Sequence, residues 1–128
     1  MTAGIRKLRS LDYVVLLCED LAPMQAFYQT VLGFSMERDW ENWVELRAGA
    51  VLLTLRTRGR PYDGPGAPGS AGVQLAFRVA KHEVDEWHSR LLDRQVQILE
   101  APRDQEYGHR TLFFQDPQGN ILEIYAEI

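Results

Sequence analysis

Two side chains of this 128-residue sequence have the chemistry of proton transfer, His109 and Glu123. Histidine titrates near neutral pH, so His109, in a predicted loop at 106–110, could serve as a general base. Glu123 lies between two apolar residues of a predicted strand, and a carboxylate buried there needs a partner, for which Arg47 is a candidate. These are the catalytic candidates, and each has a plainer alternative: a surface histidine without a role, and a carboxylate in a structural contact.

Other common catalytic and metal-binding motifs have no counterpart in the sequence. The single Cys18 cannot form an internal disulfide or anchor a zinc site alone, and its apolar surroundings predict a buried, unreactive thiol. No nucleophile motif or dinucleotide fingerprint occurs, and the glycines at 64–72 lack the strand-to-helix context of a phosphate-binding loop. The sequence therefore favours either an acid–base site or a binding site without covalent chemistry.

Composition and charge narrow the class of protein. The chain is 45% hydrophobic and 25% charged, as expected of one globular domain. Fourteen basic and 18 acidic residues give a net charge of −4 without a basic run, which argues against nucleic acid or an anionic membrane as partner. The apolar stretches at 14–18 and 48–55 are too short to span a bilayer, and 1–10 lacks the apolar region of a signal peptide, so we expect a cytoplasmic protein.

The elements that must position the candidate residues follow a repeated order. A buried strand at 11–18 leads to a helix that begins after Asp20 and ends at Gly33, and three short strands follow it. A segment rich in proline and glycine, 58–72, separates this unit from a second one. The second unit has the same order, with the predicted elements being a strand at 73–79, a helix at 82–94, and strands at 96–99, 110–115 and 120–126.

The sequence thus predicts a βαβββ unit repeated in tandem within one domain. The domain spans 1–128, with unit one at 11–57, the linker at 58–72 and unit two at 73–128. Each unit would be a twisted sheet with one face covered by its helix. We therefore expect an α+β fold in which two units form a curved mixed sheet around a central cavity.

Three segments resemble the vicinal oxygen chelate superfamily, which includes glyoxalase I, extradiol dioxygenases, fosfomycin-modifying enzymes and bleomycin resistance proteins. They are 11–33 (LDYVVLLCEDLAPMQAFYQTVLG), 43–50 (WVELRAGA) and 110–123 (RTLFFQDPQGNILE). Enzymes of this superfamily hold a divalent metal with His, Glu or Gln from the first and last strands of each unit. The resemblance places those positions at Tyr13, Gln74, Glu123 and near Leu53, where a phenol and an amide replace two imidazoles. Only Glu123 matches, so we expect no metal and no other cofactor.

Strand alternation extends the predicted cavity lining beyond those positions. Val44 and Leu46 should face the core, so the alternating residues Trp43, Glu45 and Arg47 should face the cavity. The predicted ligand-binding residues are Tyr13, Trp43, Glu45, Arg47, Gln74, Glu123 and Tyr125. Apolar aromatic walls with few polar groups are typical of small-molecule sites, here for an aromatic or cationic ligand. Alternatively, Tyr13 and Gln74 bond to each other or to Glu123 and only hold the units together.

Three functions remain open at this point. The first is a metal-independent small-molecule binding protein, a homodimer resembling the non-metal bleomycin resistance proteins, with a role in drug or toxin sequestration. Its pocket would be lined by both units, either within one chain or exchanged between chains. The second is a glyoxalase-like lyase or dioxygenase with a degenerate metal site, using Glu123 and His109 as acid or base. The third is a regulatory or partner-binding module whose cavity has collapsed.

Overall fold

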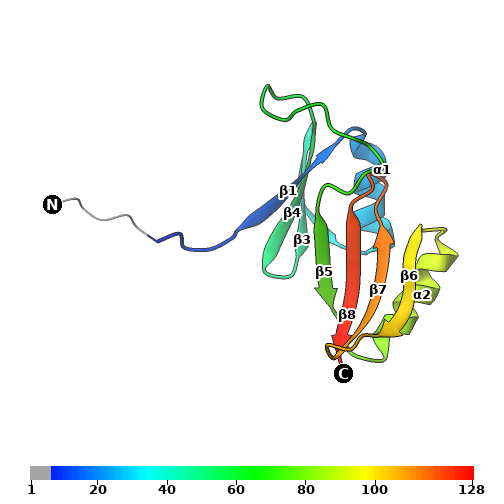
Figure 1. The fold of residues 1–128 in the computed structure, drawn as a ribbon. Coiled ribbons are helices and arrows are strands. Elements are labelled where there is room, and N and C mark those ends of the chain that lie inside the picture. The colour runs from blue at the N-terminus through cyan, green and yellow to red at the C-terminus, as the bar shows by residue number, and fades with distance from the viewer. Residues whose placement is uncertain (1–6) are drawn as a thin grey trace.

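The chain folds as two βαβββ units in tandem, as Figure 1 shows for the computed structural model, which describes residues 7–128. Unit one comprises β1 (Tyr13–Cys18), α1 (Leu21–Ala26) continued by a π-helical turn (Phe27–Val31), β2 (Ser35–Trp40), β3 (Trp43–Ala48) and β4 (Val51–Thr57). Unit two comprises β5 (Gln74–Arg78), α2 (Glu83–Asp93), β6 (Ile98–Asp104), β7 (His109–Gln115) and β8 (Ile121–Glu127). The predicted α+β class and the tandem repeat are confirmed.

Each unit builds its own four-stranded mixed sheet with the same topology. The strand orders are β1-β4-β3-β2 and β5-β8-β7-β6. In both, the first strand pairs in parallel with the last, and the remaining neighbours are antiparallel. The helix between the first and second strands supplies the crossover that a parallel pair requires. Consequently β1 and β5 are edge strands, and corresponding residues of the two units occupy equivalent positions.

Alternation along the strands divides each sheet into a core face and an open face. Val44 and Leu46 of β3 are fully buried, as are Leu122 and, nearly so, Ile124 of β8. These side chains pack against α1 and α2, and the two units share a single core, as the ring contacts between Phe27 and Phe114 (6.4 Å) and between Phe34 and Phe77 (5.5 Å) show. The intervening strand positions therefore remain on the open faces.

A polar contact joins the units next to this core. The hydroxyl of Tyr28 donates a hydrogen bond to Asp116 Oδ2 (2.6 Å), and both side chains are buried. The other oxygen of Asp116 accepts backbone N–H groups of the β7–β8 turn, including that of Gly119. Gly119 has φ +99°, and a Cβ there would meet the backbone of Gly69 at 2.6 Å, so only glycine lets the linker approach the turn.

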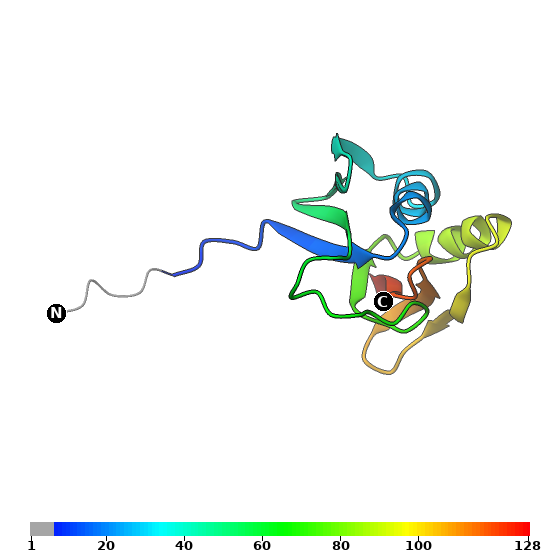
Figure 2. The same ribbon diagram turned by 90° about the horizontal axis from the view of Figure 1, so that it is seen from above.

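The two sheets are set at an angle, with both helices inside it. Figure 2 shows α1 and α2 on the same side of the molecule, next to the core faces of both sheets. The guanidinium of Arg90 in α2 donates to the carbonyls of Val31 and Thr30 and so ties the two helical segments together. The open faces consequently point outward and away from each other. No helix within residues 7–128 is long and apolar enough to cross a membrane.

Two local expectations were wrong. The strand predicted at 96–99 is β6, Ile98–Asp104, because this edge strand contains Pro102 and irregular pairing with β7, which hides its alternation. His109 does not lie in a loop but begins β7, pairing in register with Glu127. The connection between β6 and β7 therefore consists of residues 105–108.

Candidate functional site

The open face of unit one brings together four of the predicted ligand residues. Cross-strand register aligns Tyr13 with Leu52 and Arg47, and it aligns Glu45 with Thr54. Trp43 is aligned in the same way with Arg56. Alternation correctly predicted that Trp43, Glu45 and Arg47 share one face with Tyr13, opposite the core-facing residues of β3.

An aromatic pair and a carboxylate form the centre of this face. The rings of Tyr13 and Trp43 meet edge to face with centroids 6.3 Å apart, and Tyr13 remains 49% exposed. Trp43 Nε1–H donates to Glu45 Oε2 (3.0 Å), while Arg38 Nε lies 3.7 Å from Glu45 Oε1. The bond orients the indole ring beside a negative charge, an arrangement suited to a planar ring that carries a positive charge.

The open face of unit two carries the other predicted residues. Gln74 Nε2 donates a long hydrogen bond to Glu123 Oε1 (3.4 Å), and Tyr125 stacks on His109 with centroids 4.7 Å apart. Arg47 is not the partner of Glu123. Arg47 belongs to unit one, where its Nε pairs with Glu37 Oε1 at 3.0 Å. Gln74, which the resemblance placed at a metal-ligand position, thus contacts the carboxylate of Glu123, the other such position in unit two.

Thr54 is a member of the site that sequence reasoning missed. Val15 pairs with Thr54 as Ala76 pairs with Glu123, so Thr54 is the counterpart of Glu123 in unit one. The position expected near Leu53 therefore corresponds to Thr54, since Leu53 itself faces the core. Thr54 is buried, and its hydroxyl has no hydrogen-bond partner within residues 7–128. The shared apolar–polar–apolar pattern of 53–55 and 122–124 was the signal that could have identified it.

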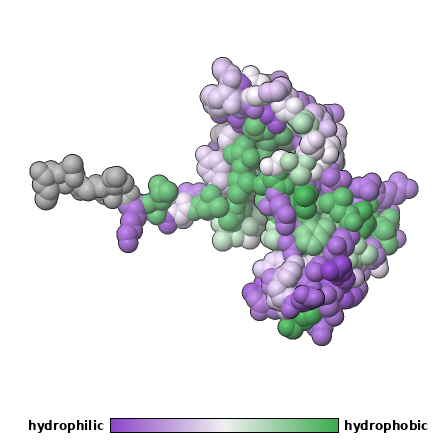
Figure 3. Space-filling view, viewed as in Figure 1, coloured by the Kyte–Doolittle hydropathy of each residue, from purple (hydrophilic) through white to green (hydrophobic). Residues whose placement is uncertain are grey.

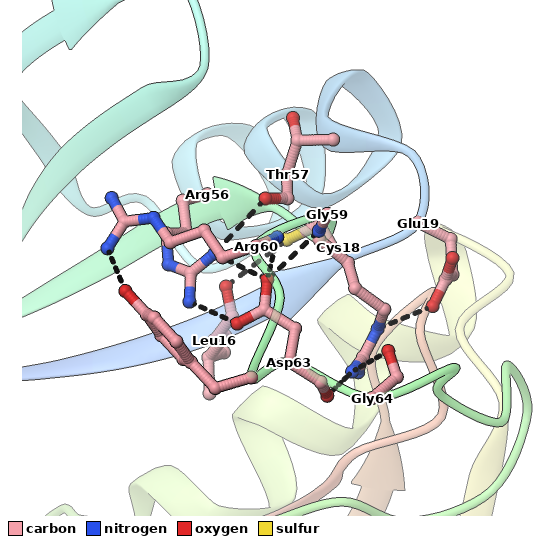
Figure 4. A network of polar contacts seen from close by, with 11 residues as sticks. Leu16, Cys18, Glu19, Arg56, Thr57, Gly59, Arg60, Asp63 and Gly64 are labelled. Carbon is pink, nitrogen blue, oxygen red and sulfur yellow. Dashed lines mark hydrogen bonds and ion pairs between the residues drawn. The ribbon is translucent and has the colours of Figure 1, made fainter.

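The linker closes one end of the unit-one face through a buried ion pair (Figure 4). Arg56 donates two hydrogen bonds to the carboxylate of Asp63, at 2.8 and 2.6 Å. Asp63 also accepts the backbone N–H groups of Gly59 and Arg60. The hydrogen bonds from Arg56 hold the pKa of the Asp63 carboxyl well below its usual range. The first residues of the linker are thereby fixed against β4.

Arg58 extends this network to the start of α1. Its Nε pairs with Glu19 Oε1 at 2.8 Å, and its Nη1 donates to the carbonyl of Asp63 at 2.7 Å. Arg56 of β4 and Arg58 of the linker are therefore both engaged by acidic groups or carbonyls. The sequence identified 58–72 only as a linker and did not predict that its first half would form a wall of the site.

The donor set does not fit the metal that the fold family implies. Within residues 7–128, no three His, Cys, Asp or Glu side chains are grouped so that they could hold an ion. Of the three corresponding positions only Glu123 is a carboxylate, and the other two are the phenol of Tyr13 and the amide of Gln74. A neutral phenol and an amide are weak ligands for a borderline divalent ion.

The two groups of predicted residues are not joined within one chain. Among residues 7–128, no hydrogen bond, ion pair or ring contact links the Tyr13–Trp43 group to the Gln74–Glu123–Tyr125 group. A hollow of about 450 Å³ does lie between the units, but β1, the linker and the β7–β8 turn line it, and none of the predicted ligand residues does. Figure 3 shows apolar surface across the middle of the molecule in the view of Figure 1, with polar surface mainly above and below it.

Comparison with known proteins gives a consistent family and fold. Residues 10–124 match the model of the Glyoxalase/Bleomycin resistance protein/Dioxygenase superfamily. A virulence protein of Salmonella typhimurium is 29% identical over 120 residues, which cover 89% of this chain and 81% of that protein. A crystal structure of a glyoxalase/bleomycin resistance protein/dioxygenase from Nocardioides superposes with a TM-score of 0.84 at 20% identity, covering 98% of this chain and 87% of the other. The fosfomycin resistance protein FosX of Listeria monocytogenes superposes with a TM-score of 0.77 at 19% identity, covering 95% and 96%.

Proposed function

The chain belongs to the Glyoxalase/Bleomycin resistance protein/Dioxygenase superfamily, and from that premise we propose that it is a metal-independent small-molecule binding protein that acts as a homodimer. Its ligand is an aromatic or cationic compound, and its role is the sequestration of a drug or toxin. The single observation that supports this most strongly is the Tyr13–Trp43 pair beside Glu45 on the open face of unit one, where Tyr13 stays half-exposed.

The proposed pocket forms between the unit-one face of one copy and the unit-two face of its partner. Within one chain these faces point away from each other, so a second copy is needed to bring both groups to one ligand. The first face supplies aromatic walls with Glu45, and the second supplies Glu123 and Tyr125. A ligand enclosed between them would lose most of its contact with water, which a single open face cannot achieve.

The chemistry of both faces favours binding over catalysis by a bound metal. Glu123 has an amide and not a cation as its contact, which leaves a carboxylate available to a positively charged ligand. FosX, which shares the fold, is described as a fosfomycin resistance protein, and this makes a role in protection against a toxic small molecule a reasonable expectation.

Mixing two variants tests the shared pocket. The probe is berberine, a planar aromatic cation, with coumarin as an uncharged aromatic comparator, followed by fluorescence titration. Trp43→Ala and Glu123→Gln should each weaken berberine binding at least tenfold, whereas Leu92→Ala, which removes an exposed apolar side chain on α2, should not. When the two weak variants are mixed and re-equilibrated, about a quarter of the wild-type sites should return, since half of the dimers are mixed and each has one intact pocket.

Three results would contradict the proposal. A monomeric chain, or no recovery on mixing, would refute the pocket shared between copies. Berberine binding that ignores both substitutions would refute the site. A stoichiometric divalent ion in protein purified without chelator, lost in Glu123→Gln, would refute metal independence and favour a lyase or dioxygenase.

A further inference from the structure

A second hollow lies at the seam between the units, on the side opposite the candidate site. It has a volume of about 200 Å³ and is lined by the end of the first helical segment, the start of β2, the end of β5 and one face of α2. Ile124, on its wall, alternates along β8 with Glu123, so the two residues point to opposite faces of the sheet. The seam hollow is therefore separate from the pocket proposed above.

Three aromatic rings line the seam hollow. Phe34 comes from unit one, Phe77 and Trp87 from unit two, and the two phenylalanine rings are 5.5 Å apart. Leu32, Val79 and Ile124 complete the apolar lining. An apolar cavity of roughly 150 Å³ is enough to hold one benzene molecule, so the volume here matches a molecule of one or two fused rings.

The charged groups at the rim are already engaged. The guanidinium of Arg90 lies 5.4 Å from the centre of the Trp87 ring and donates to the carbonyls of Val31 and Thr30. Arg78 is paired with Glu127 at 2.8 Å on the open face of the sheet. Of the seven lining residues of the hollow only Arg78 is charged, and its guanidinium pairs with Glu127 on the open face, so the apolar lining favours an uncharged occupant.

We propose that the seam hollow is a binding site for a small uncharged aromatic molecule. The ligand would pack against the rings of Phe34, Phe77 and Trp87 and would contact both units at once. Because it binds only when the units are docked, it stabilises the folded arrangement and raises the melting temperature.

Indole is the probe, and the side-chain N–H signals of the three tryptophans in ¹⁵N–¹H NMR spectra report where it binds. We expect saturable movement of the Trp87 signal without movement of the Trp43 signal, and a higher melting temperature. Val79→Phe, which places a ring in the hollow, should weaken indole binding at least tenfold. Val51→Phe makes the same change at the β3–β4 turn and should leave the affinity within twofold.

The comparator and a second filling variant keep the test decisive. Benzoate, with one ring and a carboxylate, should bind at least tenfold more weakly than indole. Leu32→Phe replaces Val79→Phe if the latter does not fold. The proposal is overturned if the Trp87 signal does not move, if Trp43 moves in its place, if the filling variant binds indole as the wild type does, or if benzoate binds as well as indole. Failure of the indole test does not contradict the pocket proposed between two copies, because that pocket is tested separately with berberine and with variants on the open faces.

Discussion

The hydrogen bond between Tyr28 and Asp116 gives the sharpest quantitative prediction. Tyr28 is fully buried at the seam, and its hydroxyl lies 2.6 Å from Asp116 Oδ2. Tyr28→Phe removes this hydroxyl and keeps the ring that packs on Phe27 and Phe34. The substitution therefore tests the polar contact between the units while leaving the apolar core nearly unchanged.

The expected loss follows from the partners that Asp116 retains. Its carboxylate still accepts three backbone N–H groups and the side-chain amide of Asn120, so it is not left unpaired. A hydrogen bond to a charged group contributes about 1.5–3 kcal/mol, and we expect the lower part of this range, about 1.5–2 kcal/mol. For a domain of this size that corresponds to a fall in Tm of about 5–10 °C.

Urea unfolding followed by circular dichroism measures the change. With a slope typical of a small domain, the midpoint should fall by about 1 M without a change in the slope itself. Tyr62→Phe is the matched control, because it removes a phenol hydroxyl that is exposed and contacts only Arg60, and it should cost less than about 0.5 kcal/mol. If Tyr28→Phe is as mild as Tyr62→Phe, the inference that this bond holds the units together is wrong.

Three further predictions concern titratable groups. Burial raises the pKa of the Cys18 thiol to about 12, so a thiol reagent at pH 8 should label the native protein only on unfolding, and one thiol per chain in urea. The pKa of Asp63 is lowered by Arg56, so its stabilising contribution is complete above the ordinary carboxyl pKa near 4 and is lost as the pH falls toward its folded value. Asp63→Asn should be less stable at pH 7 and show a flatter fall of the urea midpoint in acid, and an unchanged acid profile would contradict the ion pair. Burial, and then Asp116, raise the pKa of Tyr28, whose contribution is therefore complete below the ordinary phenol pKa near 10 and is lost as the pH rises above it. Between pH 8 and 11, the urea midpoint should fall less steeply with pH in Tyr28→Phe than in the wild type. Equal slopes in the two proteins would contradict a contribution from Tyr28 ionisation.

Much of the fold could be predicted from local patterns in the sequence. The apolar alternation of 43–47 and 121–125 predicted which side chains face the core, and the structure confirms this for Val44, Leu46, Leu122 and Ile124. The repeated order of elements around the proline- and glycine-rich linker predicted two equivalent units. Such features depend on neighbours within a few residues, which is why the sequence expresses them directly.

Other features depend on how different elements pack against one another. The contact of Gln74 with Glu123, the pairing of Arg47 with Glu37 and the burial of Arg56 by Asp63 each result from how strands and linker pack, and alternation cannot choose among such partners. The edge strand β6 shows no apolar alternation in the sequence, because it contains Pro102 and pairs irregularly with β7.

By itself, the sequence determined the two units, their core residues and the family to which they belong, because hydrophobic periodicity and turn residues act locally. Only the tertiary structure decided how the units sit on each other. Both helices pack into the angle between the sheets, since that arrangement buries Phe27, Tyr28 and Phe114 in one core. The same packing turns the open faces outward, so the residues predicted to share one pocket lie on opposite sides of a single chain.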